Sequence, residues 1–237
     1  GPKIKKAFEA DCNCELKLVA LEDGVSLLNR LRMEGKNSKA DVVLGLDNNL
    51  LDAASKTGLF AKSGVAADAV NVPGLGLLLW MQKVYGDDAP QAWQKLAKKT
   101  VTVTKGWSEA YGLFLKGESD LVLSYTTSPA YHILEEKKDN YAAANFSEGH
   151  YLQVEVAART AASKQPELAQ KFLQFMVSPA FQNAIPTGNW MYPVANVTLP
   201  AGFEQLTKPA TTLEFTPAEV AAQRQAWISE WQRAVSR

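Results

Sequence analysis

The chain has 237 residues, of which 46% are hydrophobic and 21% charged, as expected for a soluble globular protein with one large domain or two small ones. Its 25 basic and 25 acidic residues cancel, which argues against a nucleic-acid-binding protein because such proteins carry a basic surface. The longest apolar run, residues 75–81, is far shorter than the roughly 18 residues of a membrane span, so we expect no membrane-spanning helix.

Strand-like and helical patterns alternate through the first 60 residues. Apolar residues at helical spacing and unbroken apolar runs distinguish the two kinds of element. Helices are predicted over residues 3–10, 24–33 and 50–57, and strands over residues 16–21 and 41–46. The strand–helix–strand–helix order with short connections predicts a parallel sheet.

Beyond the turn at residues 71–74 the sequence again predicts both kinds of element. Proline at the first helical position marks two helix starts, at Ser128-Pro129 and at Thr216-Pro217. A long amphipathic helix contains a break at Ser178-Pro179. The predicted helices cover residues 75–84, 90–99, 106–116 and 166–185, with others starting at 128 and 216, and the predicted strands cover residues 101–104, 121–125, 141–146 and 151–158.

Cys12 and Cys14 are the only cysteines of the chain. A pair this close can form a small disulfide in an oxidising compartment or remain as two thiols. A zinc site needs further ligands, and His132 and His150 lie far away in the sequence. The sequence leaves the disulfide and the free thiols open and disfavours a metal.

Four aromatic residues stand where an α/β protein binds its ligands, namely Trp107, Tyr125, Tyr131 and Trp190. Each lies at or just beyond a junction at which a strand-like run gives way to a turn or a helix, and ligands of open α/β sheets bind outside the carboxyl ends of the strands. Aromatic faces with nearby hydroxyl groups suit a flat heterocycle, above all a cationic one. The alternative interpretation is that these residues cap helices and pack in the core or between lobes.

Polar residues occupy similar junctions. Asp23-Gly24 and Asp47-Asn48 each follow a predicted strand and precede a helix, so they point into the face where a ligand would bind. Simple helix capping is the preferred explanation of each pair. Gly74 and Gly76 open an apolar helix whose free amides suit a phosphate, although the GxGxxG spacing is absent.

No catalytic motif accompanies these residues. His132 and His150 are the only histidines, and no nucleophile motif such as GxSxG is present. We expect His132 to lie on a helix surface and not to act as a catalytic base. Carboxylates are numerous, but none has the spacing of a metal site. The sequence therefore predicts a binding protein and no enzyme, with neither a metal nor a cofactor.

Four stretches resemble one known family, namely residues 40–48, 124–131, 169–182 and 188–193. They are similar to the periplasmic thiamine-binding receptors of bacterial ABC importers, which are type II periplasmic binding proteins. The resemblance implies an α/β fold of two lobes, each with a mixed, mainly parallel sheet flanked by helices. It assigns residues 1–73 and 155–200 to the N-terminal lobe, and residues 74–154 and 201–237 to the C-terminal lobe.

The same resemblance implies a function. Thiamine or its mono- or diphosphate would lie in the cleft between the lobes, surrounded by Trp107, Tyr125, Tyr131 and Trp190. Asp23-Gly24 and the Gly74 region would lie near the phosphate end, with Asp47 also lining the cleft. The protein would be a periplasmic monomer that delivers its ligand to an inner-membrane ABC permease.

The chain departs from the family pattern in two places. By this resemblance we expect the chain to lack an N-terminal strand with an aromatic-bearing loop, and a long segment of the family at the point where this chain runs through Val72-Pro73-Gly74. Two alternative functions remain at this stage. One is a thiamine-degrading transferase on the same scaffold, although Cys12 and Cys14 precede a predicted strand and so lie at the wrong end of the sheet. The other is a shortened chain without activity.

Overall fold

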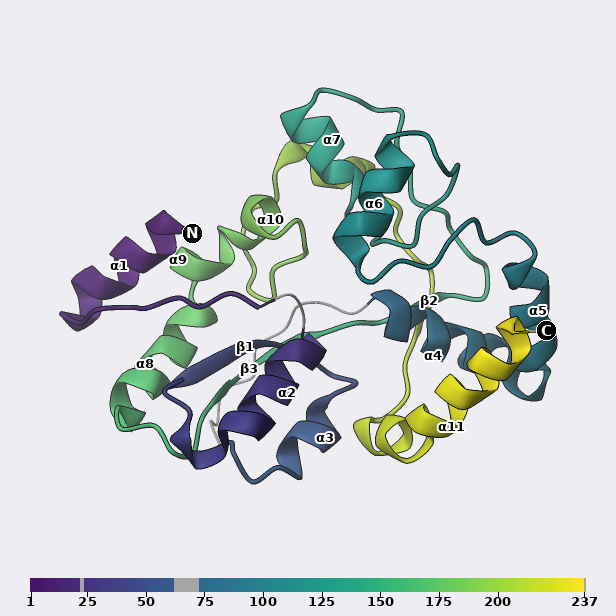
Figure 1. Cartoon of the computed structure of the whole chain (residues 1–237). Helices are drawn as coiled ribbons and strands as arrows, with labels where there is room; N and C mark the ends of the chain where they lie inside the picture. Colours follow the sequence, from purple (N-terminus) through teal and green to yellow (C-terminus); the bar gives the residue numbers. More distant parts are fainter. Residues whose placement is uncertain (22–23, 62–72, 237) are drawn as a thin grey trace.

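The computed structural model describes residues 1–21, 24–61 and 73–236. Figure 1 shows two groups of elements: α1, α2, α3, α8, β1 and β3 lie on one side, and α4, α5 and α11 on the other, with α6 and α7 above them. The helices are α1 Pro2–Cys12, α2 Gly24–Glu34, α3 Leu51–Ser55, α4 Pro73–Tyr85, α5 Ala89–Ala97, α6 Trp107–Leu115, α7 Pro129–Glu135, α8 Pro166–Met176, α9 Pro179–Gln182, α10 Ile185–Gly188 and α11 Pro217–Val235. The strands are β1 Val42–Asp47, β2 His150–Tyr151, β3 Glu155–Arg159 and β4 Thr212–Leu213, and short 3-10 helices cover Gly35–Asn37, Gly86–Asp88 and Ala201–Gln205.

The structure confirms the predicted helices, because their signals are local. At the start of α11 the Thr216 hydroxyl accepts a hydrogen bond from the Glu219 N–H (3.2 Å), and the Glu219 carboxylate accepts one from the Thr216 N–H (2.7 Å). This reciprocal capping box, with Pro217 at the first helical position, fixes the start of the helix. The long helix predicted over residues 166–185 does break near Pro179, which starts α9.

The sheets differ from the prediction. Instead of a parallel pairing within the first 60 residues, β1 pairs antiparallel with β3, and β2 pairs parallel with β4. The sheets are therefore mixed, with one pair of each kind among the described residues. Strands were also predicted over residues 16–21, 101–104, 121–125 and 141–146, and none of these predictions is correct, because those segments have no regular secondary structure. A strand exists only when a neighbour takes up its backbone hydrogen bonds, and none of the described segments does so here.

Cys12 and Cys14 are joined by a disulfide at the end of α1, which decides the alternative that the sequence left open. Asn13 between them adopts a left-handed conformation with φ of 50°, as the residue after a helix often does. The segment after the disulfide is anchored by the Leu16 N–H, which donates to the Glu9 carboxylate at 3.0 Å.

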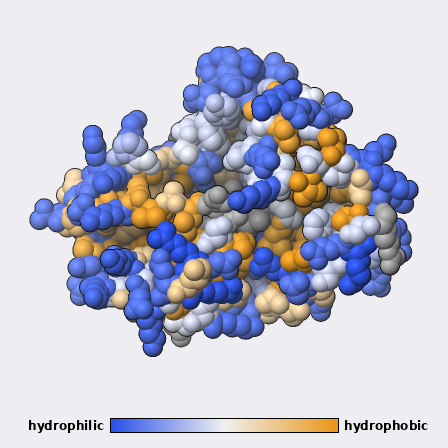
Figure 2. Space-filling view, viewed as in Figure 1, coloured by the Kyte–Doolittle hydropathy of each residue, from blue (hydrophilic) through white to orange (hydrophobic). Residues whose placement is uncertain are grey.

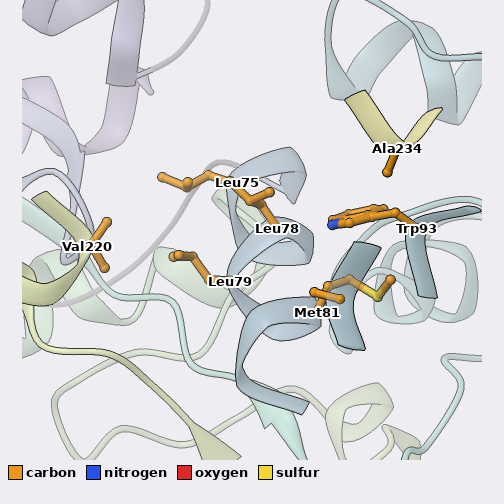
Figure 3. Close-up of a cluster of buried hydrophobic side chains, with 8 residues drawn as sticks. Leu75, Leu78, Leu79, Met81, Trp93, Val220 and Ala234 are labelled. Atoms are coloured by element: carbon orange, nitrogen blue, oxygen red, sulfur yellow. The ribbon is translucent and has the colours of Figure 1, made fainter. Parts of the chain in front are cut away.

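The largest buried apolar cluster joins α4, α5 and α11. Figure 3 shows Leu75, Leu78 and Leu79 on α4, with Val220 of α11 facing Leu79, and Ala234 of α11 beside Trp93 of α5. Leu79 and Val220 are fully buried. A second cluster lies between α2, α3 and β1, a third between β3, α8 and α9, and a smaller one between α7 and the 3-10 helix Ala201–Gln205.

Other apolar residues remain at the surface. Figure 2 shows apolar side chains gathered over α6 and the segments beside it. Val101, Val103 and Leu121 are exposed by 70%, 72% and 85%, and all three belong to segments that were predicted as strands. In the part of the chain that the structure describes, no helix has the length and hydrophobicity needed to cross a membrane.

The chain passes between the two groups of elements at residues 152–154, which link β2 to β3. Here Asn48 makes three hydrogen bonds to the crossing segment: its N–H donates to the Val154 carbonyl (2.8 Å), its side-chain oxygen accepts from the Val154 N–H (2.9 Å), and its side-chain nitrogen donates to the Leu152 carbonyl (3.5 Å). The Tyr151 hydroxyl donates to Asn49 and accepts from the Phe215 N–H, both at 3.0 Å. The lobe boundaries given above stay a prediction.

Candidate ligand-binding site

The first predicted site residue, Trp107, begins α6, stacks on Tyr111 and makes a tilted ring contact with Tyr125. Its ring centroid lies 4.9 Å from that of Tyr111 and 6.4 Å from that of Tyr125. The indole N–H donates to the Ser124 hydroxyl at 2.9 Å, and that hydroxyl shares a hydrogen bond of 2.6 Å with Ser128. These bonds fix the orientation of the indole relative to the turn that carries Tyr125.

Tyr131 and Trp190 form a second aromatic pair. Their rings meet edge to face, with centroids 5.2 Å apart and an interplanar angle of 89°. Trp190 has a positive φ of 55°, which is uncommon for a residue other than glycine and marks a tightly determined loop. The adjacent Met191 accepts a hydrogen bond from Thr127 at 3.4 Å, so this loop is held against the turn before α7. The Tyr131 side chain remains 41% exposed.

His132 connects the two aromatic pairs, and its position corrects the prediction of a surface residue. It is fully buried, because Tyr141 stacks on it at 3.9 Å between centroids. Its ring nitrogens bond to the Tyr111 hydroxyl and to the Glu136 carboxylate, each at 2.8 Å. The His132 ring stacks on Tyr111 (5.9 Å between centroids) and meets Tyr131 edge to face (5.3 Å), so the four predicted aromatic residues belong to one connected network. Sequence reasoning missed Tyr111 and His132, although their spacing within α6 and α7 could have indicated them.

Two carboxylates are opposite each other where β1 ends and β3 begins. Asp47 is fully buried and accepts hydrogen bonds from the N–H groups of Asn49 (2.9 Å) and Leu50 (3.0 Å). Burial raises the pKa of Asp47, while those backbone bonds oppose the rise. Glu155 is directly opposite Asp47 in the β1–β3 pair. Burial, and then the Asp47 charge, raise the pKa of Glu155 to about 8.

Tyr125 belongs to the aromatic network and is influenced by the charges of both carboxylates. Burial raises the pKa of its hydroxyl, and the charges of Asp47 and Glu155 raise that pKa further. The hydroxyl is buried without a hydrogen-bond partner among residues 1–21, 24–61 and 73–236. A buried hydroxyl of this kind is expected to find a partner, so it is available to a bound molecule.

Gly24 occupies a close contact behind the site. It is buried at the start of α2, and a Cβ atom there would clash with the Gly45 carbonyl of β1. Only glycine therefore lets α2 approach the end of β1 so closely. Asp23, the other half of this predicted pair, lies outside the described residues. Gly74 lies in the first turn of α4 with open space around its Cα atom.

The model of the bacterial extracellular solute-binding protein family matches residues 2–183, which is more than half of the chain. The chain belongs to this family. This match, together with the relatives and solved structures described next, confirms the predicted resemblance. The same matches confirm the predicted fold class.

Among curated relatives of this solute-binding protein, the thiamine-binding periplasmic protein of Escherichia coli strain K12 is 80% identical over 291 residues, with 100% of this chain and 89% of that protein covered. The thiamine-binding periplasmic protein of Brucella suis biovar 1 is 46% identical over 293 residues, with coverage of 100% and 88%. Since this chain has 237 residues, stretches of both relatives have no counterpart in it. Where those stretches fall stays a prediction.

Solved structures agree with the family assignment. A periplasmic thiamin binding protein superposes on the solute-binding protein with a TM-score of 0.93 at 79% identity, covering 100% of this chain and 92% of the other. A Bordetella ferric binding protein superposes with a TM-score of 0.70 at 19% identity, covering 99% and 96%. The second match shows the shared fold alone.

The cysteines and the buried histidine are all engaged within the protein. A disulfide joins Cys12 to Cys14, and the ring nitrogens of His132 bond to the Tyr111 hydroxyl and the Glu136 carboxylate. Among the described residues no group of three or more histidine, cysteine or carboxylate side chains is placed to hold a metal ion. A hollow of about 350 Å³ between α2 and α3 lies elsewhere and is lined by the cations Arg32 and Lys56, so it does not suit a cationic ligand.

Proposed function

We propose that this solute-binding protein binds thiamine in the cleft between its two lobes. The observation that carries the proposal is the 80% identity to a thiamine-binding periplasmic protein over the whole of this chain. The aromatic network supports it, because a thiazolium ring stacked on desolvated aromatic faces gains roughly 0.5–2 kcal/mol per contact. The ligand is held by stacking and hydrogen bonds, without a covalent step.

The four aromatic residues contact the ligand as two pairs. Trp107 and Tyr125 present one pair of rings from α6 and the adjacent turn, and Tyr131 and Trp190 present the other. We also assign Asp23, Gly24 and Asp47 to the ligand-binding residues, of which Asp47 ends β1. The mono- and diphosphate of thiamine bind in the same orientation, with the phosphate near the start of α4.

The site works by conformational change between lobes. Ligand that contacts both lobes favours the closed form, so the equilibrium between open and closed forms shifts as the ligand binds. The closed protein then docks, as a monomer in the periplasm, on the permease of an ABC importer.

Calorimetric titration of thiamine into the purified chain tests the proposal. We expect saturable binding of one thiamine per chain. Absence of heat and of any change in tryptophan fluorescence at millimolar thiamine would contradict it. Release of free pyrimidine from thiamine in the presence of a nucleophilic base would instead establish the transferase alternative.

A further inference from the structure

A column of stacked rings extends from Trp107 into the protein. Tyr111 stacks on Trp107, with centroids 4.9 Å apart and an interplanar angle of 27°. His132 stacks on Tyr111 with centroids 5.9 Å apart, and Tyr141 stacks on His132 with centroids 3.9 Å apart. The column joins α6 to α7, which lie together in Figure 1. A fully buried histidine is therefore only two rings away from a proposed ligand contact.

A chain of hydrogen bonds connects the same residues. The Glu136 carboxylate lies 2.8 Å from Nδ1 of His132, and the Tyr111 hydroxyl lies 2.8 Å from Nε2. A carboxylate can only accept, so Nδ1 carries the proton, and in the neutral imidazole Nε2 then accepts from the Tyr111 hydroxyl. Burial raises the pKa of Tyr111, so its hydroxyl keeps the proton that it donates. Glu136 thus fixes the tautomer of His132, and His132 fixes the Tyr111 hydroxyl.

Trp107 is held at its edge and on one face. Its indole N–H donates to the Ser124 hydroxyl at 2.9 Å, but one hydrogen bond in the plane of a ring does not set the tilt of that plane. Tyr111 lies four residues later in α6, so its ring covers one face of the indole. A ligand that stacks on Trp107 therefore meets a ring plane whose tilt Tyr111 sets.

We infer that Tyr111 is a positioning residue, which sets the ring plane of Trp107 for ligand stacking and is itself held in place by His132 and Glu136. The inference rests on the proposed function, since thiamine is the ligand that stacks on Trp107. If these hydrogen bonds only satisfied a buried histidine, their loss would lower stability without acting through Trp107. A positioning role makes the effect on affinity depend on Trp107, and this dependence can be measured.

A double-mutant cycle with thiamine as the probe tests whether Tyr111 acts through Trp107. Tyr111→Phe removes the hydroxyl and keeps the ring, and we expect it to weaken thiamine binding by about fivefold in calorimetric titration. In the Trp107→Ala background the same change should weaken binding by less than about twofold, because the ring that Tyr111 positions is absent. Equal losses in the two backgrounds, or no loss in either, would overturn the inference.

A second measurement needs no ligand. The chain has six tryptophans, so labelling with 5-fluorotryptophan gives six fluorine NMR signals, and Trp107→Phe identifies the signal of Trp107. We expect Tyr111→Phe to shift and broaden this signal in the ligand-free protein, because a ring whose tilt is no longer set samples several orientations. An unchanged Trp107 signal would also overturn the inference.

Glu136 offers a matched set of variants at the far end of the hydrogen-bond chain. Glu136→Ala removes the acceptor of His132 and should weaken thiamine binding by about threefold, whereas Glu136→Gln keeps an acceptor and should bind within about twofold of the unaltered chain. Glu135→Ala, at the adjacent exposed position, should change neither the affinity nor the Trp107 signal. Equal affinities of Glu136→Ala and Glu135→Ala would contradict the role of Glu136 and His132.

Thermal unfolding of each variant checks that it is folded. If the unaltered chain does not bind thiamine, the proposed function fails, and the fluorine signals still decide whether Tyr111 positions Trp107. If it binds thiamine and Tyr111→Phe leaves both the affinity and the Trp107 signal unchanged, only the role of Tyr111 fails.

Discussion

The cluster of α4, α5 and α11 and the segments at residues 101–104 and 121–125 are both rich in apolar side chains, yet their surroundings are opposite. Leu79 is 0% exposed in the cluster, whereas Val103 is 72% and Leu121 is 85% exposed in the segments. A helix completes its backbone hydrogen bonds within itself and needs only a face to pack against. A strand needs a neighbour before its side chains can be buried. The apolar side chains of residues 101–104 and 121–125 are therefore exposed because these segments have no paired neighbour, whereas β1, which pairs with β3, buries Val43 and Leu46.

The largest expected effect is the difference in unfolding free energy when a leucine is replaced in each of these two regions. Leu79→Ala removes a fully buried side chain and should lower the free energy of unfolding by about 2–5 kcal/mol, because it leaves a cavity between α4, α5 and α11. Leu121→Ala removes the same atoms at an exposed position and should change it by less than about 0.5 kcal/mol. Urea unfolding followed by circular dichroism measures both. A large effect of Leu121→Ala would mean that the 121–125 segment is packed in solution.

The second prediction concerns the strand pair and depends on pH. The pKa of Glu155 is about 8 in the folded protein and near 4.5 when unfolded, so between these values the folded state holds a proton that the unfolded state has released. Stability then falls as pH rises from about 4.5 to 8, by at most about 1.4 kcal/mol per pH unit. Glu155→Gln should flatten this slope.

Denaturant unfolding at pH 5, 6, 7 and 8 measures the slope for both proteins. The pKa of Asp47 is also raised, so Asp47 likewise lowers stability as pH rises. Arg224 limits the rise of this pKa, and a smaller dependence of stability on pH should therefore remain in Glu155→Gln. The Tyr125 hydroxyl stays neutral throughout this range because its pKa is raised further. Identical slopes in the two proteins would show that Glu155 is solvated in the folded state.

The third prediction compares aromatic residues of the proposed site with one of the α11 cluster. It tests whether the site residues contact the ligand or only pack within the protein. Trp107→Ala and Trp190→Ala should each weaken thiamine binding by more than about 1 kcal/mol, because each removes an aromatic face. Trp227→Ala, in the α11 cluster, should leave binding nearly unchanged while lowering stability. Calorimetric titration measures the thiamine affinity of the three variants. Unchanged binding in both Trp107→Ala and Trp190→Ala would contradict binding of thiamine by ring stacking.

The smallest expected effect lies at the start of α11. Thr216→Ala removes the hydroxyl that accepts the Glu219 N–H and should lower the free energy of unfolding by about 1 kcal/mol. Thr216→Ser keeps the hydroxyl and serves as the matched control, with little change expected. Thermal unfolding with the calorimeter distinguishes the two variants. A loss in both would indicate that the threonine methyl group, and not the cap, stabilises the helix.

Much of the site could be predicted from sequence, but not how it is assembled. Trp107, Tyr125, Tyr131 and Trp190 stand out because aromatic residues at element boundaries are unusual, and the structure places them in one network. Whether each contacts the ligand stays a prediction. Glu155, the first residue of β3, has no such local signal, because the residues that precede it form no distinctive pattern. Its partner across the sheet is 108 positions away by the register Asp47↔Glu155, and sequence alone does not reveal that pairing.

The sequence by itself determined the helices, their caps and the break at Pro179, because hydrogen bonds and apolar faces of a helix depend on residues within a few positions of each other. It also determined the family, through stretches of residues that the chain shares with its relatives. Only the tertiary structure decided which of the predicted strands form, that β1 pairs with β3, and that Asp47 is opposite Glu155. Those features depend on backbone partners far away in the chain, and a local pattern contains no information about which partner is present.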